Sequence, residues 1–258
     1  MAPRIKNLLL GVSPFVAILL IWEISSSLGL ISEFLMPAPG KVFSTFFRLI
    51  KEGVLLKLFL VSLLNIIPAF ILAAVAAVTM GTLIGVIDLW RRIFSPLLSA
   101  VYIVPSLAWL PLIILILGFT RETIWAVVMV SSFTRIIYIV IGGIKSVNIN
   151  YLLIAKNLEL SRLTTVWKVI LPAALPHILS SLRIGFGSSW RSLIGAEMLV
   201  VTAGGLGKYI WASQWVFKFD QVVSGILMVA LLGIVSELFV FKKIEQITLT
   251  KWGMQSPE

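Results

Sequence analysis

The sequence predicts an all-α, polytopic membrane protein with about six transmembrane helices. Hydrophobic residues make up 59% of its 258 positions and charged residues only 12%, whereas a soluble domain carries about 25% charge. Several apolar runs exceed the ~20 residues that an α-helix needs to cross a bilayer. The net charge of +10 comes from basic residues between and beside these runs, where lysine and arginine set topology and contact lipid headgroups. The basic excess therefore indicates a lipid bilayer and no nucleic acid as the partner.

The first predicted span is the apolar run from Leu8 to Trp22, which follows two basic residues and precedes Glu23. A cleaved signal peptide is the alternative, because small residues at Ser25 and Ser27 follow the run at a permissible spacing. Since further spans follow, we favour a retained transmembrane helix.

Met36 to Gly53 predicts an amphipathic helix that lies on the membrane surface. Pro37 and Pro39 open the segment, and basic residues occupy the positions between its apolar ones. An apolar face at helical spacing beside a basic face is typical of a helix in the headgroup region. The apolar positions are Val42, Phe43, Phe46, Phe47 and Ile50.

Three further spans are predicted before residue 145. They are Leu58–Ile87, Ile93–Thr120 and Thr123–Ile144. The first two carry no charge, and the third contains Arg135. In the middle span, Pro105 and Pro111 remove backbone hydrogen bonds. Two interpretations stay open: a hinge whose carbonyls face a solute path, or kinks that neighbouring helices accommodate.

A cationic, amphipathic stretch from Tyr151 to Pro176 separates these spans from the last two. We interpret it as a docking element for a soluble partner, with a simple interfacial helix as the alternative. The last two spans are His177–Val201 and Gln221–Phe241. Between them, the glycine- and tryptophan-rich segment Thr202–Phe219 predicts a loop with a short interfacial helix.

Six spans place both ends of the chain on one side of the membrane. With the N-terminus inside, the inner segments hold eleven Lys and Arg residues and the outer segments seven. The positive-inside rule therefore favours cytoplasmic N- and C-termini and a cytoplasmic central stretch.

The spacing of residues 153–172 resembles the cytoplasmic motif of binding-protein-dependent ABC importer permeases. That motif is Glu-Ala-Ala, three residues, Gly, nine residues and Ile-x-Leu-Pro. In this chain its places are taken by Leu153, Ile154, Ala155, Glu159, Val169, Leu171 and Pro172. The spacing is kept, whereas the Glu, the first Ala and the Gly are replaced.

Other stretches are similar, in order and spacing, to permeases of the nitrate, sulfonate, taurine and bicarbonate type. They are Met36–Gly53, Tyr102–Phe119, Leu171–Phe186 and Ala196–Ile210. The resemblance covers about residues 10–250. It implies a single permease domain over residues 1–258, with a cytoplasmic coupling segment at about 148–172.

The resemblance implies the type I ABC importer permease fold in the inner (cytoplasmic) membrane. Such a subunit is no enzyme and holds no cofactor, because separate cytoplasmic ATPase subunits bind ATP and Mg²⁺. A second permease copy, as a homodimer, and an extracytoplasmic solute-binding protein complete the transporter. The expected cargo is a small anion such as a sulfonate, taurine, nitrate or bicarbonate, moved by alternating access. An ATP-independent secondary transporter or channel is the alternative, although the sequence shows no internal repeat.

The residues that the resemblance implies for ATPase coupling are Leu153, Ile154, Ala155, Lys156, Leu158, Glu159, Ser161 and Arg162. Asn148 or Asn150 can cap the start of this helix. The family glycine permits a tight turn with positive φ. Because Glu159 cannot adopt that conformation cheaply, we expect the turn to be replaced by continued helix.

Polar and helix-breaking residues within the spans are candidates for the translocation path: Pro105, Arg135, Arg183, Trp190 and Glu197. Intramembrane charges are costly unless they are paired or hydrated. Arg183 and Glu197 lie fourteen residues apart and share a helix face, as a polar track for an anionic solute would require. The alternative, which we prefer, pairs each with a neighbouring span, with Arg135 as the available partner for Glu197.

Other chemistries lack the necessary residues. The sequence has no cysteine and one histidine, His177, which excludes disulfides, thiolate sites and histidine-cluster metal sites. The glycine-rich segment 204–208 does not match a Walker A loop, because Thr202 and Tyr209 stand in the required Gly and Ser or Thr places. No Ser-His-Asp set or carboxylate pair occurs in an aqueous segment, so we expect no catalytic site.

Overall fold

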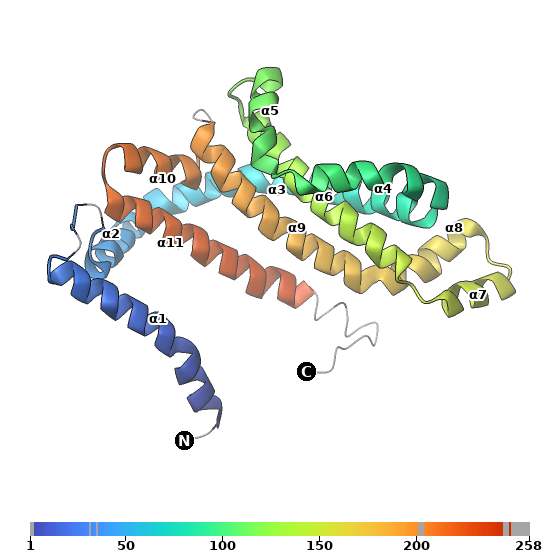
Figure 1. Ribbon diagram of the computed structural model, residues 1–258, viewed down its shortest axis with the longest axis horizontal. Helices are drawn as coiled ribbons and strands as arrows, with labels where there is room; N and C mark the ends of the chain where they lie inside the picture. The colour runs from blue at the N-terminus through green and yellow to red at the C-terminus, as the bar shows by residue number, and fades with distance from the viewer. Residues whose placement is uncertain (1–2, 31, 35, 201–203, 245–247, 249–258) are drawn as a thin grey trace.

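The computed structural model describes residues 3–30, 32–34, 36–200, 204–244 and 248, with side chains from Ser13 onward except at residue 240 (Figure 1). All regular structure in these residues is helical, which confirms the all-α fold class. Three positions used in the sequence analysis lie outside the described residues: the span end at Val201, Thr202 in the glycine-rich segment, and Lys251, one of the eleven basic residues counted in the inner segments.

The described helices follow one another with short connections. The α-helices are α1 Pro3–Ser27, α2 Pro39–Lys51, α3 Val54–Val86, α4 Asp88–Ile103, α5 Leu110–Leu117, α6 Arg121–Lys145, α7 Ile149–Asn157, α8 Arg162–Thr165, α9 Leu171–Leu199, α10 Leu206–Trp215 and α11 Phe219–Val235. The 3₁₀-helix η1 covers Ser106–Trp109, and the π-helices η2 and η4 cover Val166–Ile170 and Ser236–Phe241.

Four helical segments of the described chain are long and apolar enough to cross a membrane. They are Val54–Val86, Arg121–Lys145, Arg162–Leu199 and Phe219–Ile244. A fifth crossing results if the bent pair Asp88–Ile103 and Ser106–Leu117 counts as one span. The described apolar part of α1, Ser13–Ser27, is shorter than these segments. All six predicted spans thus contain helix. Within the described residues, however, the first span is short and the third is bent.

The third predicted span, Ile93–Thr120, is broken. α4 ends at Ile103, Val104 and Pro105 are extended (ψ 125° and 134°), and the chain continues through η1 and α5 at 92° to α4 (Figure 1). Pro105 lies at the break because proline lacks an N–H and disfavours helix in the residue before it. Pro111 lies in the first turn of α5, where no intrahelical bond is lost.

The predicted amphipathic helix at Met36–Gly53 forms as α2. Its buried stripe contains Val42, Thr45 and Leu49, and this stripe packs against α11 and α3. Phe47 is exposed, so the bulkiest apolar side chains do not all point into the protein. Gly53 adopts a left-handed conformation (φ 73°) and turns the chain sharply from α2 into α3.

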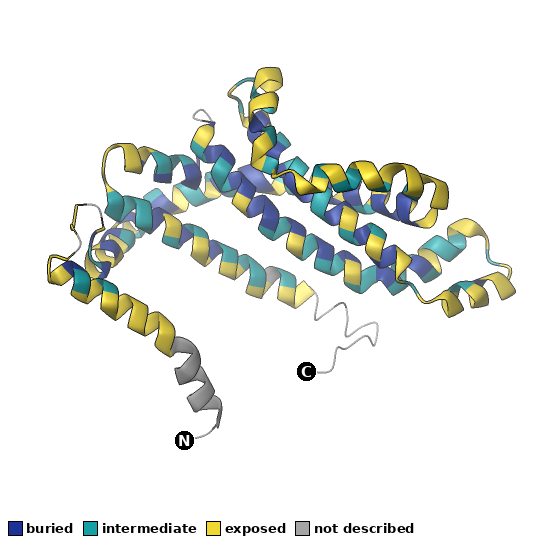
Figure 2. Cartoon of the chain, viewed as in Figure 1, coloured by how far each residue is buried: buried dark blue, intermediate teal, exposed yellow. Residues whose placement is uncertain are grey.

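Three long helices, α3, α6 and α9, make the most extensive contacts of the fold, with α6 between the other two. Buried residues concentrate on them, whereas α4, α7 and the described part of α1 (Ser13–Ser27) are mostly exposed (Figure 2). Glycines permit the close approach: a Cβ on Gly81 or Gly85 of α3 would lie 2.9 or 2.8 Å from side-chain atoms of Val140 or Ile144. Small residues at such crossings are typical of membrane helices, which associate through close packing.

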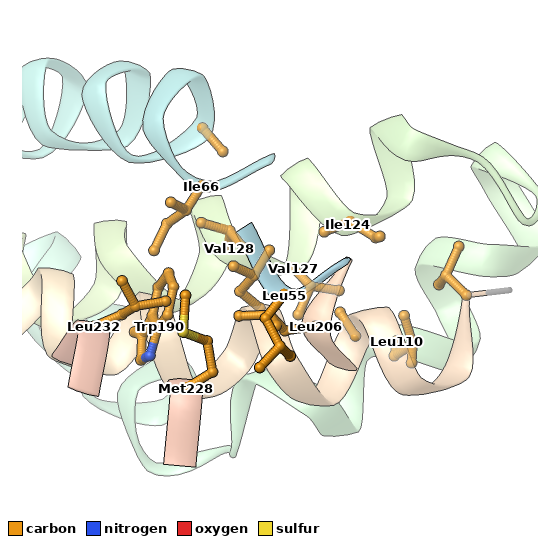
Figure 3. Close-up of a cluster of buried hydrophobic side chains, with 14 of the residues drawn as sticks. Leu55, Ile66, Leu110, Ile124, Val127, Val128, Trp190, Leu206, Met228 and Leu232 are labelled. Carbon is orange, nitrogen blue, oxygen red and sulfur yellow. The ribbon is translucent and has the colours of Figure 1, made fainter. Parts of the chain in front are cut away.

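The core divides into two clusters along these helices. One lies toward α2, α5 and α10 and includes Leu55, Ile124 and Trp190 (Figure 3). The other lies toward α7 and includes Ile137 and Ile170. The molecule thus has two ends, one beside α10 and one at α7 and α8, joined by α3, α6 and α9 (Figure 1).

Candidate coupling and translocation sites

The predicted coupling segment forms two short helices, α7 and α8, that lead through η2 into α9. Asn148 caps α7, because its side-chain oxygen accepts a hydrogen bond from the Asn150 backbone N–H at 2.9 Å. Ser161 caps α8 in the same way, accepting from the Thr164 N–H at 3.2 Å. The sequence expectation that Asn148 or Asn150 begins this helix is confirmed for Asn148.

The apolar side chains of α7 point mostly away from the protein. Ala155 is buried (2% exposed), whereas Leu153, Ile154 and Leu158 are 51%, 54% and 66% exposed. Leu163 of α8 is also exposed. Lys156, Glu159, Ser161 and Arg162 are exposed as well. Seven of the eight proposed coupling residues therefore lie on the surface, and Ala155 attaches α7 to the rest of the protein.

Two pockets lie against α7. One, of about 750 Å³, lies between α7, α8 and the α3–α4 junction, and its charged lining residues are Asp88, Lys156 and Arg162. The other, of about 640 Å³, lies between α7, the end of α6 and the start of α9, beside Lys168 and His177. Apolar side chains make up most of both linings, with a few charged or polar groups among them.

The expectation that Glu159 continues the helix is wrong. Glu159 adopts the left-handed conformation (φ 51°). The Leu160 N–H donates to the Ala155 carbonyl at 3.1 Å and the Glu159 N–H to the Lys156 carbonyl at 3.0 Å, the two bonds of a Schellman C-cap. These bonds offset the cost of a left-handed non-glycine residue, so the turn keeps its geometry without the family's glycine.

Glu197 is fully buried near the C-terminal end of α9. Its carboxylate accepts hydrogen bonds from Ser62 Oγ (2.9 Å), Asn65 Nδ2 (2.9 Å) and the Gly207 N–H (3.0 Å). The preferred interpretation, that Glu197 pairs with a neighbouring span, is confirmed by its bonds to α3, but Arg135 as its partner is wrong. Arg121 instead donates to Asn65 Oδ1 at 2.7 Å, which brings a positive charge next to the carboxylate through the Asn65 amide.

Two glycines make room for the Glu197 carboxylate. A Cβ on Gly205 would collide with the carboxylate itself, and one on Gly207 would lie 2.8 Å from the Glu197 Cβ. Gly205 also has a positive φ of 100°, which glycine adopts without strain. The glycine-rich segment that fails as a phosphate loop thus packs around a buried carboxylate, and sequence spacing gave no signal of this partner.

Arg183 and Trp190 also have structural contacts. Arg183 forms an ion pair with Glu237 of η4, so the preferred interpretation that Arg183 pairs with a neighbouring span is confirmed. Trp190 is 8% exposed, and its Nε1–H donates to the Val229 carbonyl at 3.3 Å. Arg183, Trp190 and Glu197 therefore do not form a continuous polar track. Each of them bonds to a different neighbour, in η4, in α11, and in α3 and α10 respectively.

Arg135 of α6 lies over the ring of Tyr102, with its Cζ 5.5 Å from the ring centroid. Tyr102 stacks on Tyr138 at 4.8 Å with an interplanar angle of 19°. Tyr102 belongs to the last turn of α4, three residues before Pro105. The two remaining path candidates, Arg135 and Pro105, thus lie close to the same aromatic side chain.

Sequence reasoning missed a row of serine hydroxyls where α6 meets α9. Ser131 hydrogen-bonds with Ser188 (3.0 Å) and Ser192 (2.9 Å), and Ser192 with Ser106 of η1 (2.7 Å). Ser132 bonds with Ser189 one residue further on. The Ser131-Ser132 and Ser188-Ser189 pairs in the sequence were the available signal, because helices that cross in membranes use such hydroxyls as interhelical bonds.

Comparison with known proteins identifies the family. Residues 77–241, well over half of the chain, match the family described as binding-protein-dependent transport system inner membrane component. The chain belongs to this family. It is a transport permease, and the family is not one of enzymes.

Individual relatives agree with this family and with the subgroup. The chain is 29% identical to the taurine transport system permease protein TauC of Escherichia coli (strain K12), over 97% of this chain and 92% of that protein. It is 31% identical to the protein named as an aliphatic sulfonates transport permease, SsuC, of Bacillus subtilis (strain 168), over 91% and 84% of the two chains. Nitrate import and bicarbonate transport permeases are also similar to it.

A solved structure shares the fold. An inward-facing crystal structure of the MetNI methionine ABC transporter matches with a TM-score of 0.61 and 18% identity, covering 73% of this permease and 93% of that chain. The match supports the ABC importer permease fold for the helices described above.

Proposed function

We propose that this permease is the transmembrane subunit of an ATP-driven ABC importer that moves a small anion across the cytoplasmic membrane. The relatives are named for the transport of taurine, sulfonates, nitrate and bicarbonate. Each of these solutes carries an anionic group, which in taurine is a sulfonate on a molecule that also has an amine. The observation that carries the proposal is the exposed apolar surface of α7 and α8, formed by residues such as Leu153, Ile154, Leu158 and Leu163.

This surface fits a cytoplasmic ATPase subunit. Apolar side chains that project from a short, capped helix suit insertion into a groove of a partner, and the basic Lys156 and Arg162 beside them can contact acidic groups. The partner binds ATP and Mg²⁺, a second copy of the permease completes the membrane part, and an extracytoplasmic solute-binding protein delivers the anion. The proposal places α7, α8 and both termini in the cytoplasm.

Alternating access requires that the ATPase make different contacts in two states of the permease. α7 and α8 are the elements that it can displace, because few of their side chains are buried. α8 continues through η2 directly into α9, so a displacement at α8 reaches the transmembrane bundle through a continuous helix.

A co-purification experiment tests the docking step. The permease is co-expressed with the ATPase subunit of its own transport system and purified through a tag on the permease. We expect Leu158→Asp to lower the amount of bound ATPase about tenfold, since an interface hot spot contributes ~1–2 kcal/mol or more. Val216→Asp is the matched control, because Val216 is similarly exposed (61% against 66% for Leu158) but lies at the opposite end of the molecule.

Equal recovery of the ATPase with Leu158→Asp and with the wild type would contradict docking at α7. Transport then has to be compared in proteoliposomes with and without ATP. Anion uptake by the permease without any ATPase would favour the rival function, a secondary transporter or channel.

A further inference from the structure

The guanidinium of Arg135 has no counter-charge in the described part of the chain. It lies near the middle of α6, a helix of 25 residues, where a charge is costly unless it is paired or hydrated. The acidic residues within α9 and η4 have other partners: Glu197 accepts from Ser62, Asn65 and Gly207, and Glu237 pairs with Arg183.

The contact between Arg135 and Tyr102 leaves the polar edge of the guanidinium free. An aromatic ring attracts a cation through its face, whereas the five N–H groups of a guanidinium point outward in its own plane. Among the described residues, none of these N–H groups donates a hydrogen bond to an acceptor. Tyr102 and Tyr138 are 38% and 47% exposed, so the cluster is open to an approaching molecule.

The backbone beside this cluster indicates a hydrated surface. Val104 and Pro105 are extended and exposed, and non-helical backbone within a membrane is tolerated where it lines water or is covered by protein, not where it faces lipid. Ser106, the next residue, hydrogen-bonds with Ser192. The break in the third span and the unpaired cation therefore require the same polar environment at the same place.

We propose that Arg135, Tyr102 and Tyr138 form a binding site for the anionic oxygen atoms of the transported solute, beside the break at Pro105. The planar guanidinium can donate two parallel hydrogen bonds to a sulfonate, nitrate or carboxylate-like oxyanion. The tyrosine hydroxyls supply further donors, and the aromatic rings fix the guanidinium plane. The inference rests on the proposed function, because it assigns a place in the membrane to the anion that the importer moves.

The test uses the complete importer, assembled from permease, ATPase and binding protein in proteoliposomes. Uptake of taurine, ethanesulfonate, nitrate and bicarbonate is measured with the wild type, and the anion taken up is then used with the variants. We expect Arg135→Gln to lower uptake about tenfold or more while the ATPase still co-purifies. Arg135→Lys keeps the charge but loses the two-pronged donor set, so we expect partial uptake with a raised KM. A lysine variant with the wild-type KM would overturn the assignment.

Two further variants separate the site from a general or structural effect. Tyr102→Phe keeps the ring over Arg135 and removes one donor, and we expect a raised KM with an unchanged amount of folded protein. Arg191→Gln removes a second, exposed arginine from α9 and should have a much smaller effect on uptake. Equal losses in Arg135→Gln and Arg191→Gln would overturn a local site in favour of a general need for positive charge.

Failure of the importer itself has a different signature. If the wild type shows no ATP-dependent uptake of any of the four anions, the proposed function fails. The site is then tested alone by isothermal titration of the detergent-solubilised permease with the same anions. Binding that Arg135→Gln abolishes would retain the site, and the absence of binding would overturn it.

Discussion

The two ends of the permease differ in what they bury: one buries a charged side chain, and the other exposes apolar side chains. At the α9–α10 junction, the Glu197 carboxylate is fully buried and accepts three hydrogen bonds from α3 and α10. In α7, one residue, Ala155, is buried and its apolar neighbours are exposed. The Glu197 carboxylate thus has all its partners within a single chain, whereas the apolar side chains of α7 have no covering surface among the described residues. The difference indicates that the Glu197 site stabilises the fold and that α7 is available to another protein.

The turns at the two ends differ in the residue type that adopts a positive φ angle. Gly204 and Gly205 supply the positive φ angles at the α9–α10 junction, whereas Glu159 supplies the one after α7. Glycine is required where a carboxylate packs directly against the backbone. After α7 the left-handed residue is exposed, so a side chain is tolerated there at a cost in conformational energy.

The largest expected effect comes from removing the buried carboxylate. Glu197→Ala leaves Ser62, Asn65 and the Gly207 N–H without their acceptor, which should lower the free energy of unfolding by about 3–5 kcal/mol. Thermal unfolding of the purified permease in detergent measures this as a fall in Tm. The matched change Glu33→Ala, at an exposed carboxylate, should leave Tm unchanged. A similar Tm for both variants would mean that the junction is not held by Glu197.

The second prediction compares two neighbouring sites on α7. Ala155→Asp introduces a carboxylate at the buried position and should destabilise the fold by about 2–4 kcal/mol. Leu158→Asp, on the exposed face, should leave the free energy of unfolding within about 0.5 kcal/mol of the wild type and affect binding of the ATPase instead. If Leu158→Asp unfolds the permease, the α7 end is not an open surface, and the contrast between the two ends is lost.

The third prediction compares the two glycines at the α9–α10 junction. Gly205→Ala adds a methyl group against the Glu197 carboxylate, whereas the nearest contact of a Cβ on Gly204 is Val61 at 3.5 Å. Both glycines have positive φ, but Gly205 combines φ 100° with ψ 179°, a conformation that is essentially restricted to glycine. We therefore expect Gly205→Ala to lose about 1–3 kcal/mol more than Gly204→Ala, through overpacking together with the larger backbone strain. Urea or thermal unfolding of the two variants measures the difference directly.

The smallest effect is a gain in stability. Glu159→Gly relieves the left-handed strain after α7 and should raise the free energy of unfolding by up to about 1 kcal/mol. Glu159→Ala removes the same carboxylate but keeps the strain, so its Tm should match the wild type. A Tm gain in both variants would assign the effect to the lost charge and not to the backbone.

Local patterns in the sequence were enough for much of the fold. Uninterrupted apolar runs indicated where the spans lie. An apolar segment inside a bilayer has no water to bond its backbone, so it forms a helix, which bonds its own backbone groups. The Asn148 cap and the position of α7 followed from residue types within a few positions. Pro105 indicated a break in the third span, but the 92° direction of the chain after it depends on packing against α6 and α9, which no local pattern contains.

Contacts between distant parts of the chain could not be predicted. Ser62 and Asn65 lie more than 130 residues before Glu197, and a serine and an asparagine within an apolar run carry no mark of their partner. Arg135 was predicted as the partner of Glu197 because its charge is opposite. In the structure, neutral donors bond to that carboxylate instead. At Glu159, side-chain identity suggested continued helix, whereas the two backbone bonds of the Schellman cap determined the turn.

α8, η2 and α9 together form one continuous helical rod, Arg162–Leu199, of 38 residues. At about 1.5 Å per residue its length is roughly 57 Å, well beyond the thickness of a bilayer core. One end of this helix carries the exposed surface of α8. Near the other end, Glu197 accepts a hydrogen bond from the Gly207 N–H of α10. Because the helix is continuous, we expect a tilt applied at the α8 tip to move α10 as well. The π-helix η2 interrupts the regular winding close to the α8 tip, and because helices bend preferentially at such interruptions, we expect any bend of this helix to occur at η2.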